Sequence, residues 1–188
     1  MNIRKLLSKE NFIDIIQLVE EKRIYLFRSL EEYGINFTTK TKSELISQLF
    51  ESSLYEYFQG KGVNTERAGS DSLKPDILFT DTNTPLEIKT TKGDYWIGGS
   101  YSKRSGDFLL VSWDDEDQIP VYFISHVKLE KKDWATEGEN FYGTKFKKKE
   151  LMNNKTAIIL MGDLIEQNRG IKMIKQSIKD VMNNYETV

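Results

Sequence analysis

The fold is decided by residues 75–90, which read PDILFTDTNTPLEIKT. Two runs of strand-forming residues, 76–80 and 86–90, are separated by a short polar segment rich in turn-forming residues. This spacing predicts a β-hairpin, because two antiparallel strands joined by a short turn need that pattern. In such a hairpin, Asp76 at the start of one strand lies beside Glu87 on the other.

On the second strand of this hairpin, residues two apart point to the same face of the sheet. Glu87 and Lys89 are therefore predicted to project together. Leu86, Ile88 and Thr90 face the other way. The strand thus has one charged face and one largely apolar face.

Two carboxylates that converge on one point repel each other unless a cation lies between them. Oxygen ligands favour Mg²⁺ or Mn²⁺ over Zn²⁺, so we expect Mg²⁺ as the cofactor and Mn²⁺ as a substitute. Asp76 and Glu87 are the predicted ligands, with the backbone carbonyl of Ile88 as a further one. Such an ion lowers the pKa of a bound water, which Lys89 would orient. The alternative is a surface hairpin with solvated charges.

Pro75, Asp76, Glu87 and Lys89 resemble the signature of the PD-(D/E)xK superfamily, the restriction-endonuclease-like nucleases. The resemblance implies a Mg²⁺-dependent DNA endonuclease in which Asp76, Glu87 and Lys89 are catalytic. It also implies an α/β fold with a restriction-endonuclease-like core, a mixed central β-sheet flanked by α-helices, over roughly residues 42–130.

A helix upstream of the hairpin is predicted over about residues 42–59, where apolar residues recur at helical spacing. Family members commonly add an acid from this helix, and the candidates are Glu44, Glu51 and Glu56. Thr41-x-x-Glu44 reads as a capping box, which gives Glu44 a structural role. Glu51 is therefore the predicted fourth catalytic residue, with a solvated helix position as the alternative.

The remaining periodic segments complete a single predicted domain over residues 1–188. They are an N-terminal helix over 8–32, strands over 108–113, 121–129 and 156–161, and a C-terminal helix over about 170–185. The length of 188 residues and the apolar content of 38% suffice to bury one core. A second large domain does not fit.

Several cations near the hairpin are candidates for DNA contact. The segment 90–106 mixes cations, hydroxyls, glycines and aromatic side chains, the residue types that contact phosphates and stack on bases. The candidates are Lys92, Lys103 and Arg104 in this segment, and Arg67 and Lys74 upstream. The alternative is a glycine-rich surface loop whose Tyr95 and Trp96 pack on the core. Lysine runs within 128–132 and 145–149 are interpreted mainly as solvated faces.

The chain has one histidine and no cysteine. Neither a thiolate zinc site nor a histidine-based hydrolytic triad therefore has support. His126 falls in an apolar strand pattern and is predicted to be structural. There is no apolar run of membrane-spanning length, and the N-terminal apolar stretch is too short for a signal peptide. We expect a cytoplasmic protein with no membrane association.

The charge balance points to a partner. The chain has 27 basic and 29 acidic residues, a formal charge of -2. That is unusual for a free-standing DNA-binding protein, and no helix-turn-helix or zinc finger is evident. We therefore expect a larger subunit to recognise double-stranded DNA. By size, acidity and motif the chain is similar to the small catalytic subunit of a heterodimeric type IIS restriction endonuclease, which cuts one strand.

Two other functions fit the same residues. The order of helix, glycine, strand, loop and aspartate over residues 51–76 also resembles resolvase-like members of the superfamily, which act on Holliday junctions and other branched DNA. A noncatalytic nucleic-acid-binding or protein-binding module is the third interpretation. The complete set of Asp76, Glu87 and Lys89 argues against it.

Overall fold

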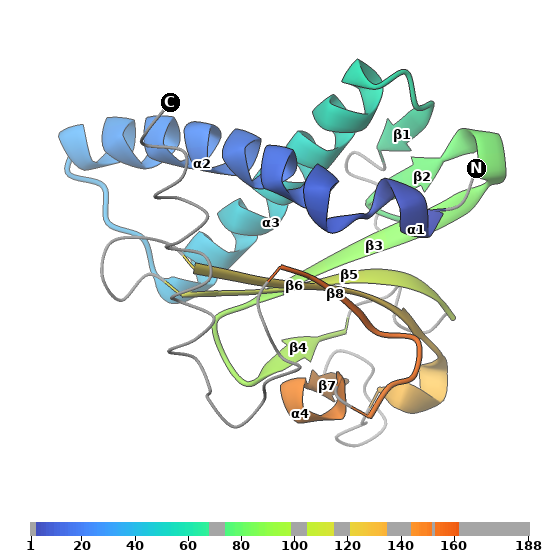
Figure 1. Cartoon of the computed structure of the whole chain (residues 1–188). Helices are drawn as coiled ribbons and strands as arrows, with labels where there is room; N and C mark the ends of the chain where they lie inside the picture. The colour runs from blue at the N-terminus through green and yellow to red at the C-terminus, as the bar shows by residue number, and fades with distance from the viewer. Residues whose placement is uncertain are drawn as a thin grey trace.

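The computed structural model describes residues 3–67, 74–98, 105–114, 121–134, 144–151 and 153–161 (Figure 1). The helices are α1 (Ile3–Leu6), α2 (Lys9–Glu32), α3 (Thr39–Gly60) and α4 (Lys148–Leu151). The strands are β1 (Thr65–Arg67), β2 (Ile77–Phe79), β3 (Thr84–Thr91), β4 (Tyr95–Ile97), β5 (Gly106–Asp114), β6 (Val121–Leu129), β7 (Lys145–Lys147) and β8 (Ile158–Met161). Short 3₁₀ helices span Thr80–Thr82 and Lys131–Asp133.

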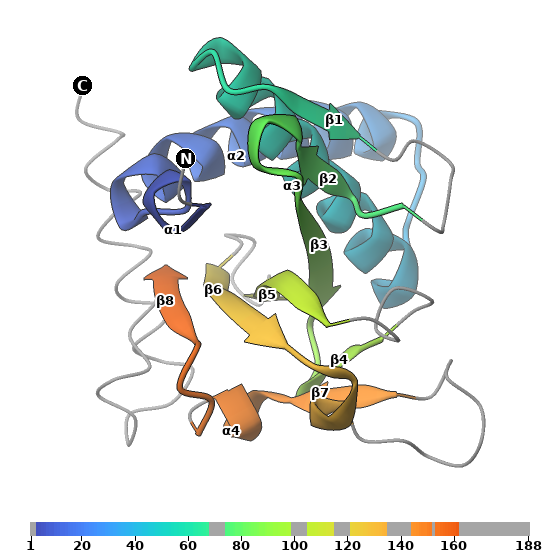
Figure 2. The same ribbon diagram turned by 90° about the vertical axis from the view of Figure 1, so that its right-hand side faces the viewer.

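Six strands form one mixed sheet in the order β1-β2-β3-β5-β6-β8, which Figure 2 shows from the side. Strands β3 and β5 are parallel, and the other neighbours are antiparallel. Strands β4 and β7 pair separately as a two-stranded sheet. The predicted α/β class with a mixed central sheet is confirmed.

The two faces of the large sheet are covered differently. Helices α2 and α3 lie over one face, and β4, β7 and α4 lie on the other side (Figure 1). Leu86 and Ile88 of β3 pack in the core with the helices, as their alternation predicts. Phe108 and Leu110 of β5 pack in a second cluster with Trp96 of β4 and Phe146 of β7. Strand β3 therefore turns Glu87 and Lys89 away from the helices.

Most predicted elements appear with small changes in their ends. The predicted helix 8–32 is α2, and the predicted strands 108–113, 121–129 and 156–161 are β5, β6 and β8. The hairpin forms from β2 and β3, which are joined by the first 3₁₀ turn. The predicted C-terminal helix 170–185 lies outside the described residues.

The predicted capping box at Thr41 and Glu44 is wrong. Helix α3 already begins at Thr39, because Thr38 has extended backbone angles and caps it. The Thr38 hydroxyl accepts a hydrogen bond from the backbone N–H of Thr41 at 3.2 Å. Glu44 is exposed within the helix, 3.9 Å from Lys40. Thr38 is thus the N-cap that the sequence placed at Thr41, and Glu44 is not the acid of a capping box.

A second difference concerns the segment after the hairpin. Part of the predicted loop 90–106 is strand β4, whose partner β7 comes from the lysine run at 145–149. Each strand has only three residues, and they lie about fifty positions apart in the chain. Such short, distant pairs have no local sequence signal.

Within the described residues, no helix is long and apolar enough to cross a membrane.

Candidate active site

Asp76 lies across from Glu87 and is hydrogen-bonded to the backbone of β3 at the next residue, Ile88. Strand β2 begins at Ile77, which pairs with Leu86, so Asp76 stands just outside the ladder and across from Glu87. The Asp76 carboxylate accepts a hydrogen bond from the backbone N–H of Ile88 at 2.7 Å. Just beyond the start of β2, the Asp76 side chain therefore takes the place of a backbone carbonyl as hydrogen-bond acceptor for β3. This bond fixes Asp76 relative to β3, the strand that carries Glu87.

The backbone carbonyl of Ile88 points to the side of β3 on which Asp76 lies. In a strand, the N–H and C=O groups of one residue point toward the same neighbour. Because the Ile88 N–H points to Asp76, its carbonyl also points to the β2 side, beyond the end of that strand. This direction agrees with the prediction that the Ile88 carbonyl is available as a ligand.

Glu87 is buried and only half satisfied. Its side chain lies on β3 beside Lys89, whose ammonium is 2.5 Å from Glu87 Oε1. Glu87 is 5% exposed, and among the described residues its Oε2 atom has no hydrogen-bond partner. Buried polar atoms are normally paired, so an open carboxylate oxygen at this depth needs a reason.

Burial dominates the electrostatics of the two acids, and the charge of Lys89 is the main opposing influence. Burial raises the pKa of Glu87 to about 7; Lys89 opposes this rise and the charge of Asp76 adds to it. Burial also raises the pKa of Asp76, against the attraction of Lys89, the Ile88 N–H and Arg67. The fold therefore holds two carboxyl groups where ionisation is unfavourable unless more positive charge arrives.

These residues fit a hard divalent cation. No group of three or more histidine, cysteine, aspartate or glutamate side chains in the described ranges is arranged to hold a metal. Two carboxylates and one carbonyl are nevertheless sufficient for Mg²⁺, which keeps several waters and is commonly bound by one or two protein carboxylates plus substrate phosphate. The open Oε2 of Glu87 is the observation that favours such an ion.

Of the three helix acids, Glu51 is the one for which an electrostatic interaction with Asp76 is seen. Burial raises its pKa, which Arg67 lowers and the nearby charge of Asp76 raises further. Glu56 instead forms an ion pair with Lys22 at 2.6 Å, and Glu44 is exposed. The structure thus places Glu51, and not the other two, beside the predicted site. Whether it takes part in catalysis remains a prediction.

Arg67 bridges the helix acid and the hairpin. Its Nε donates to Glu51 Oε1 at 2.9 Å, and its guanidinium carbon lies 5.9 Å from the centre of the Tyr55 ring. In the sheet Arg67 is paired with Ile77, the residue after Asp76. The sequence did not reveal this ion pair, because a strand residue sixteen positions after a helix residue has no fixed relation to it.

The other predicted DNA contacts are spread around the site. Lys92 follows the end of β3, with its ammonium 5.5 Å from the centre of the Trp113 ring. Lys74 is exposed two residues before Asp76. Lys103 and Arg104 lie outside the described residues. None of these positions tests DNA contact, which remains a prediction for all of them.

Trp96 and Tyr95 behave differently. Trp96 is fully buried, and its indole N–H donates to the Val111 carbonyl at 2.9 Å. It is therefore a core residue, as the alternative interpretation of this segment predicted. Tyr95 is 36% exposed, with the Lys145 ammonium 4.7 Å from the centre of its ring.

His126 is 2% exposed and its Nε2 lies 2.8 Å from Asp107 Oδ1, a pairing between neighbouring strands.

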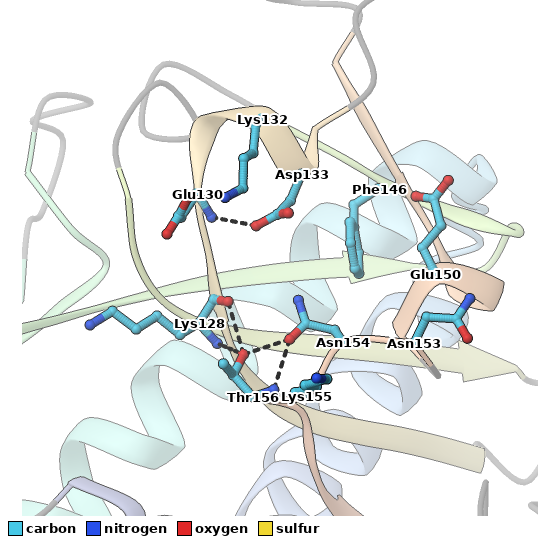
Figure 3. A pocket seen from close by; sticks show the side chains of 10 residues that line it. All are labelled: Lys128, Glu130, Lys132, Asp133, Phe146, Glu150, Asn153, Asn154, Lys155 and Thr156. Atoms are coloured by element: carbon cyan, nitrogen blue, oxygen red, sulfur yellow. Dashed lines mark hydrogen bonds and ion pairs between the residues drawn. The ribbon is translucent and has the colours of Figure 1, made fainter.

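The groove at the end of β6 contains part of the lysine run that follows (Figure 3). Its polar groups stabilise turns: Lys132 pairs with Glu130 at 2.7 Å, and Thr156 bonds both backbone groups of Lys128. The contacts shown for His126 and for this groove are between neighbouring strands and turns.

Fold and site together define an α/β protein with a mixed sheet, in which the half-buried Asp76, just before β2, lies across from the buried Glu87 and near Lys89 on β3. A scan against models of protein families found no match to this chain, and a search of curated proteins found none either. The functional assignment therefore depends on the geometry of the site.

Proposed function

We propose that this protein is a Mg²⁺-dependent DNA endonuclease of the PD-(D/E)xK type, the catalytic chain of a type II or IIS restriction system. The observation that supports it most is the half-buried Asp76 across from the buried Glu87, with Lys89 alongside and the Glu87 Oε2 atom without a hydrogen-bond partner among the described residues. A structural salt bridge with Lys89 needs only one of the two acids, whereas a divalent cation accounts for the presence of both.

Each residue then has a defined part. Asp76, Glu87 and the Ile88 carbonyl hold the cation. A bound Mg²⁺ or Mn²⁺ ion supplies Lewis-acid stabilisation of phosphate charge and makes a bound water more acidic. Lys89, anchored by Glu87, donates from its ammonium to the attacking water and orients it. The water displaces the 3′ oxygen in line, which leaves a 5′ phosphate.

The net charge of the chain supports the proposal that DNA recognition and DNA cleavage belong to different subunits. With 29 acidic and 27 basic residues, the protein has little long-range attraction for a polyanion. A larger subunit that recognises the duplex would deliver DNA to the site, and this chain would cut one strand. A restriction-endonuclease-like arrangement of the core belongs to the same proposal.

The first experiment measures Mg²⁺-dependent cleavage of plasmid DNA by the purified chain, alone and with a candidate large subunit from the same source. Asp76→Ala and Lys89→Ala should each reduce cleavage by about a hundredfold or more, with folding retained. Glu44→Gln, which changes an exposed acid on α3, is the matched control and should cut normally. Cleavage by Lys89→Ala at the wild-type rate would refute the assigned site.

The choice of substrate separates the remaining functions. Cleavage of linear duplex, with or without the partner, indicates a restriction-type enzyme. Selective cleavage of a four-way junction indicates a structure-selective resolvase-like nuclease, which uses the same site. Binding without cleavage under every condition indicates a noncatalytic module.

A further inference from the structure

Arg67 is held by Glu51 and Tyr55 of α3. Its Nε donates to Glu51, and its guanidinium carbon lies 5.9 Å from the centre of the Tyr55 ring. The salt bridge uses Nε alone, whereas an arginine that only neutralises a carboxylate commonly makes two parallel hydrogen bonds. Among the described residues, the two terminal nitrogens form no hydrogen bond. The side chain is 38% exposed.

The position of Arg67 relative to the carboxylates is equally specific. Its backbone pairs with Ile77 of β2, so Arg67 lies on the strand next to the hairpin, close to Asp76. The neighbourhood contains three carboxylates, Glu51, Asp76 and Glu87, and the ammonium of Lys89 is already engaged by Glu87. An approaching phosphodiester backbone needs a further cation here to offset that negative charge.

We propose that Arg67 binds a phosphate of the DNA strand next to the one that is cut, and that Glu51 and Tyr55 are positioning residues for it. The proposal rests on the proposed function for its substrate class, double-stranded DNA. The guanidinium fork matches the geometry of two phosphate oxygens, and a lysine would not reproduce it. Glu51 then acts through Arg67.

The test measures binding of a short duplex in the Lys89→Ala background, where cleavage is blocked, at several salt concentrations. Adding Arg67→Met should weaken binding by about tenfold or more. The slope of log affinity against log salt should also fall by about 0.9, the value for one lost phosphate contact. Adding Arg67→Lys should keep the slope and still lose affinity. Arg28→Met, an exposed arginine on α2, is the matched control and should change neither quantity.

Variants of Glu51 distinguish positioning of Arg67 from metal binding. The amide oxygen of Glu51→Gln can still accept from Arg67 Nε, so this variant should retain DNA affinity. Glu51→Ala should lose affinity to a similar extent as Arg67→Met, and the double variant should be no worse than either. A normal DNA affinity for Glu51→Ala, together with a raised Mg²⁺ requirement for cleavage, would overturn the positioning role.

The outcomes for this inference and for the proposed function are separable. Cleavage by the wild type with an unchanged affinity and salt slope in Arg67→Met refutes the inference alone. DNA binding that depends on Arg67 without any cleavage refutes the nuclease and leaves the phosphate site standing. Absence of DNA binding by every protein, both alone and with the candidate large subunit, refutes both.

Discussion

Glu87 combines burial, an unpartnered carboxylate oxygen among the described residues and a raised pKa in one side chain. It is buried beside one cation and one acid, and one of its oxygens has no partner among the described residues. In the metal-free protein its pKa is about 7 instead of the ordinary 4.5, mainly because of burial. Burial without a full set of partners destabilises the ionised form of a glutamate that has only a structural role. For a metal ligand, the same setting holds the carboxylate in position before the ion binds.

This pKa predicts how stability changes with pH. The folded protein holds the Glu87 proton more tightly than the unfolded chain does. The metal-free protein should therefore lose stability as the pH rises from about 4.5 to about 7, and lose no more from this group above that. Glu87→Gln has no such proton to lose. At pH 8 it should exceed the wild type in free energy of unfolding by up to roughly 3 kcal/mol, and by less at pH 5.

Urea unfolding at pH 5 and pH 8 with a chelator present measures this difference. Glu44→Gln is the control, and its difference from the wild type should not change with pH. A difference between Glu87→Gln and the wild type that is equal at both pH values would contradict the assignment of the raised pKa to Glu87.

At the scale of elements, β3 joins the core and the site in one strand. Leu86 and Ile88 are buried against the helical layer, while Glu87 and Lys89 occupy the opposite face. Because side chains alternate, a slip of one residue in register would exchange the two sets. The bond from the Thr90 hydroxyl to the Ser43 carbonyl, 3.0 Å long, ties this strand to α3 and so helps to fix its position.

The start of α3 gives a prediction at the same scale. Thr38 is the N-cap, so Thr38→Ala should destabilise the protein by about 1 kcal/mol, and Thr38→Ser by much less. Thr41→Ala should have a smaller effect, because Thr41 lies inside the helix and its backbone N–H remains. Denaturant unfolding of the three variants measures this. A larger loss for Thr41→Ala than for Thr38→Ala would restore the capping box that the sequence suggested.

At the scale of the whole molecule, the helical layer is tied to the sheet by a buried polar cluster. The Tyr122 hydroxyl of β6 donates to Glu20 of α2 at 2.6 Å, and Arg23 binds the same carboxylate with contacts of 2.8 Å and 3.0 Å. Glu20 is only 7% exposed, and burial raises the pKa of Tyr122 well above its ordinary value. The cluster joins residues 102 positions apart.

Removing this tie should cost stability but not activity. Tyr122→Phe leaves Glu20 with one fewer donor in a buried setting, so we expect a loss of about 1–3 kcal/mol in the free energy of unfolding. Tyr25→Phe is the control, because Tyr25 is 79% exposed on the same helix. Equal stability of the Tyr122→Phe and Tyr25→Phe proteins would show that the cluster contributes nothing.

Most of the central fold could be predicted from the sequence, because periodicity and turn chemistry are local signals. The hairpin, α2, most of α3 and the strands β5, β6 and β8 follow from them. The β4–β7 sheet, the cap at Thr38 and the Arg67–Glu51 ion pair do not, since each depends on partners chosen by the tertiary fold. For the site, spacing predicted which acids meet, while the bond from Ile88 to Asp76 appears only in the structure.

The most direct test of the central claim, that Asp76 and Glu87 form a divalent-cation site, is a Mn²⁺ titration at pH 8 followed by the electron paramagnetic resonance signal of free Mn²⁺. The wild type should bind the ion, and Glu87→Gln should bind it at least about tenfold more weakly. Glu44→Gln should behave as the wild type does. Equal binding by all three proteins, or none by any, would contradict the assignment of the metal site.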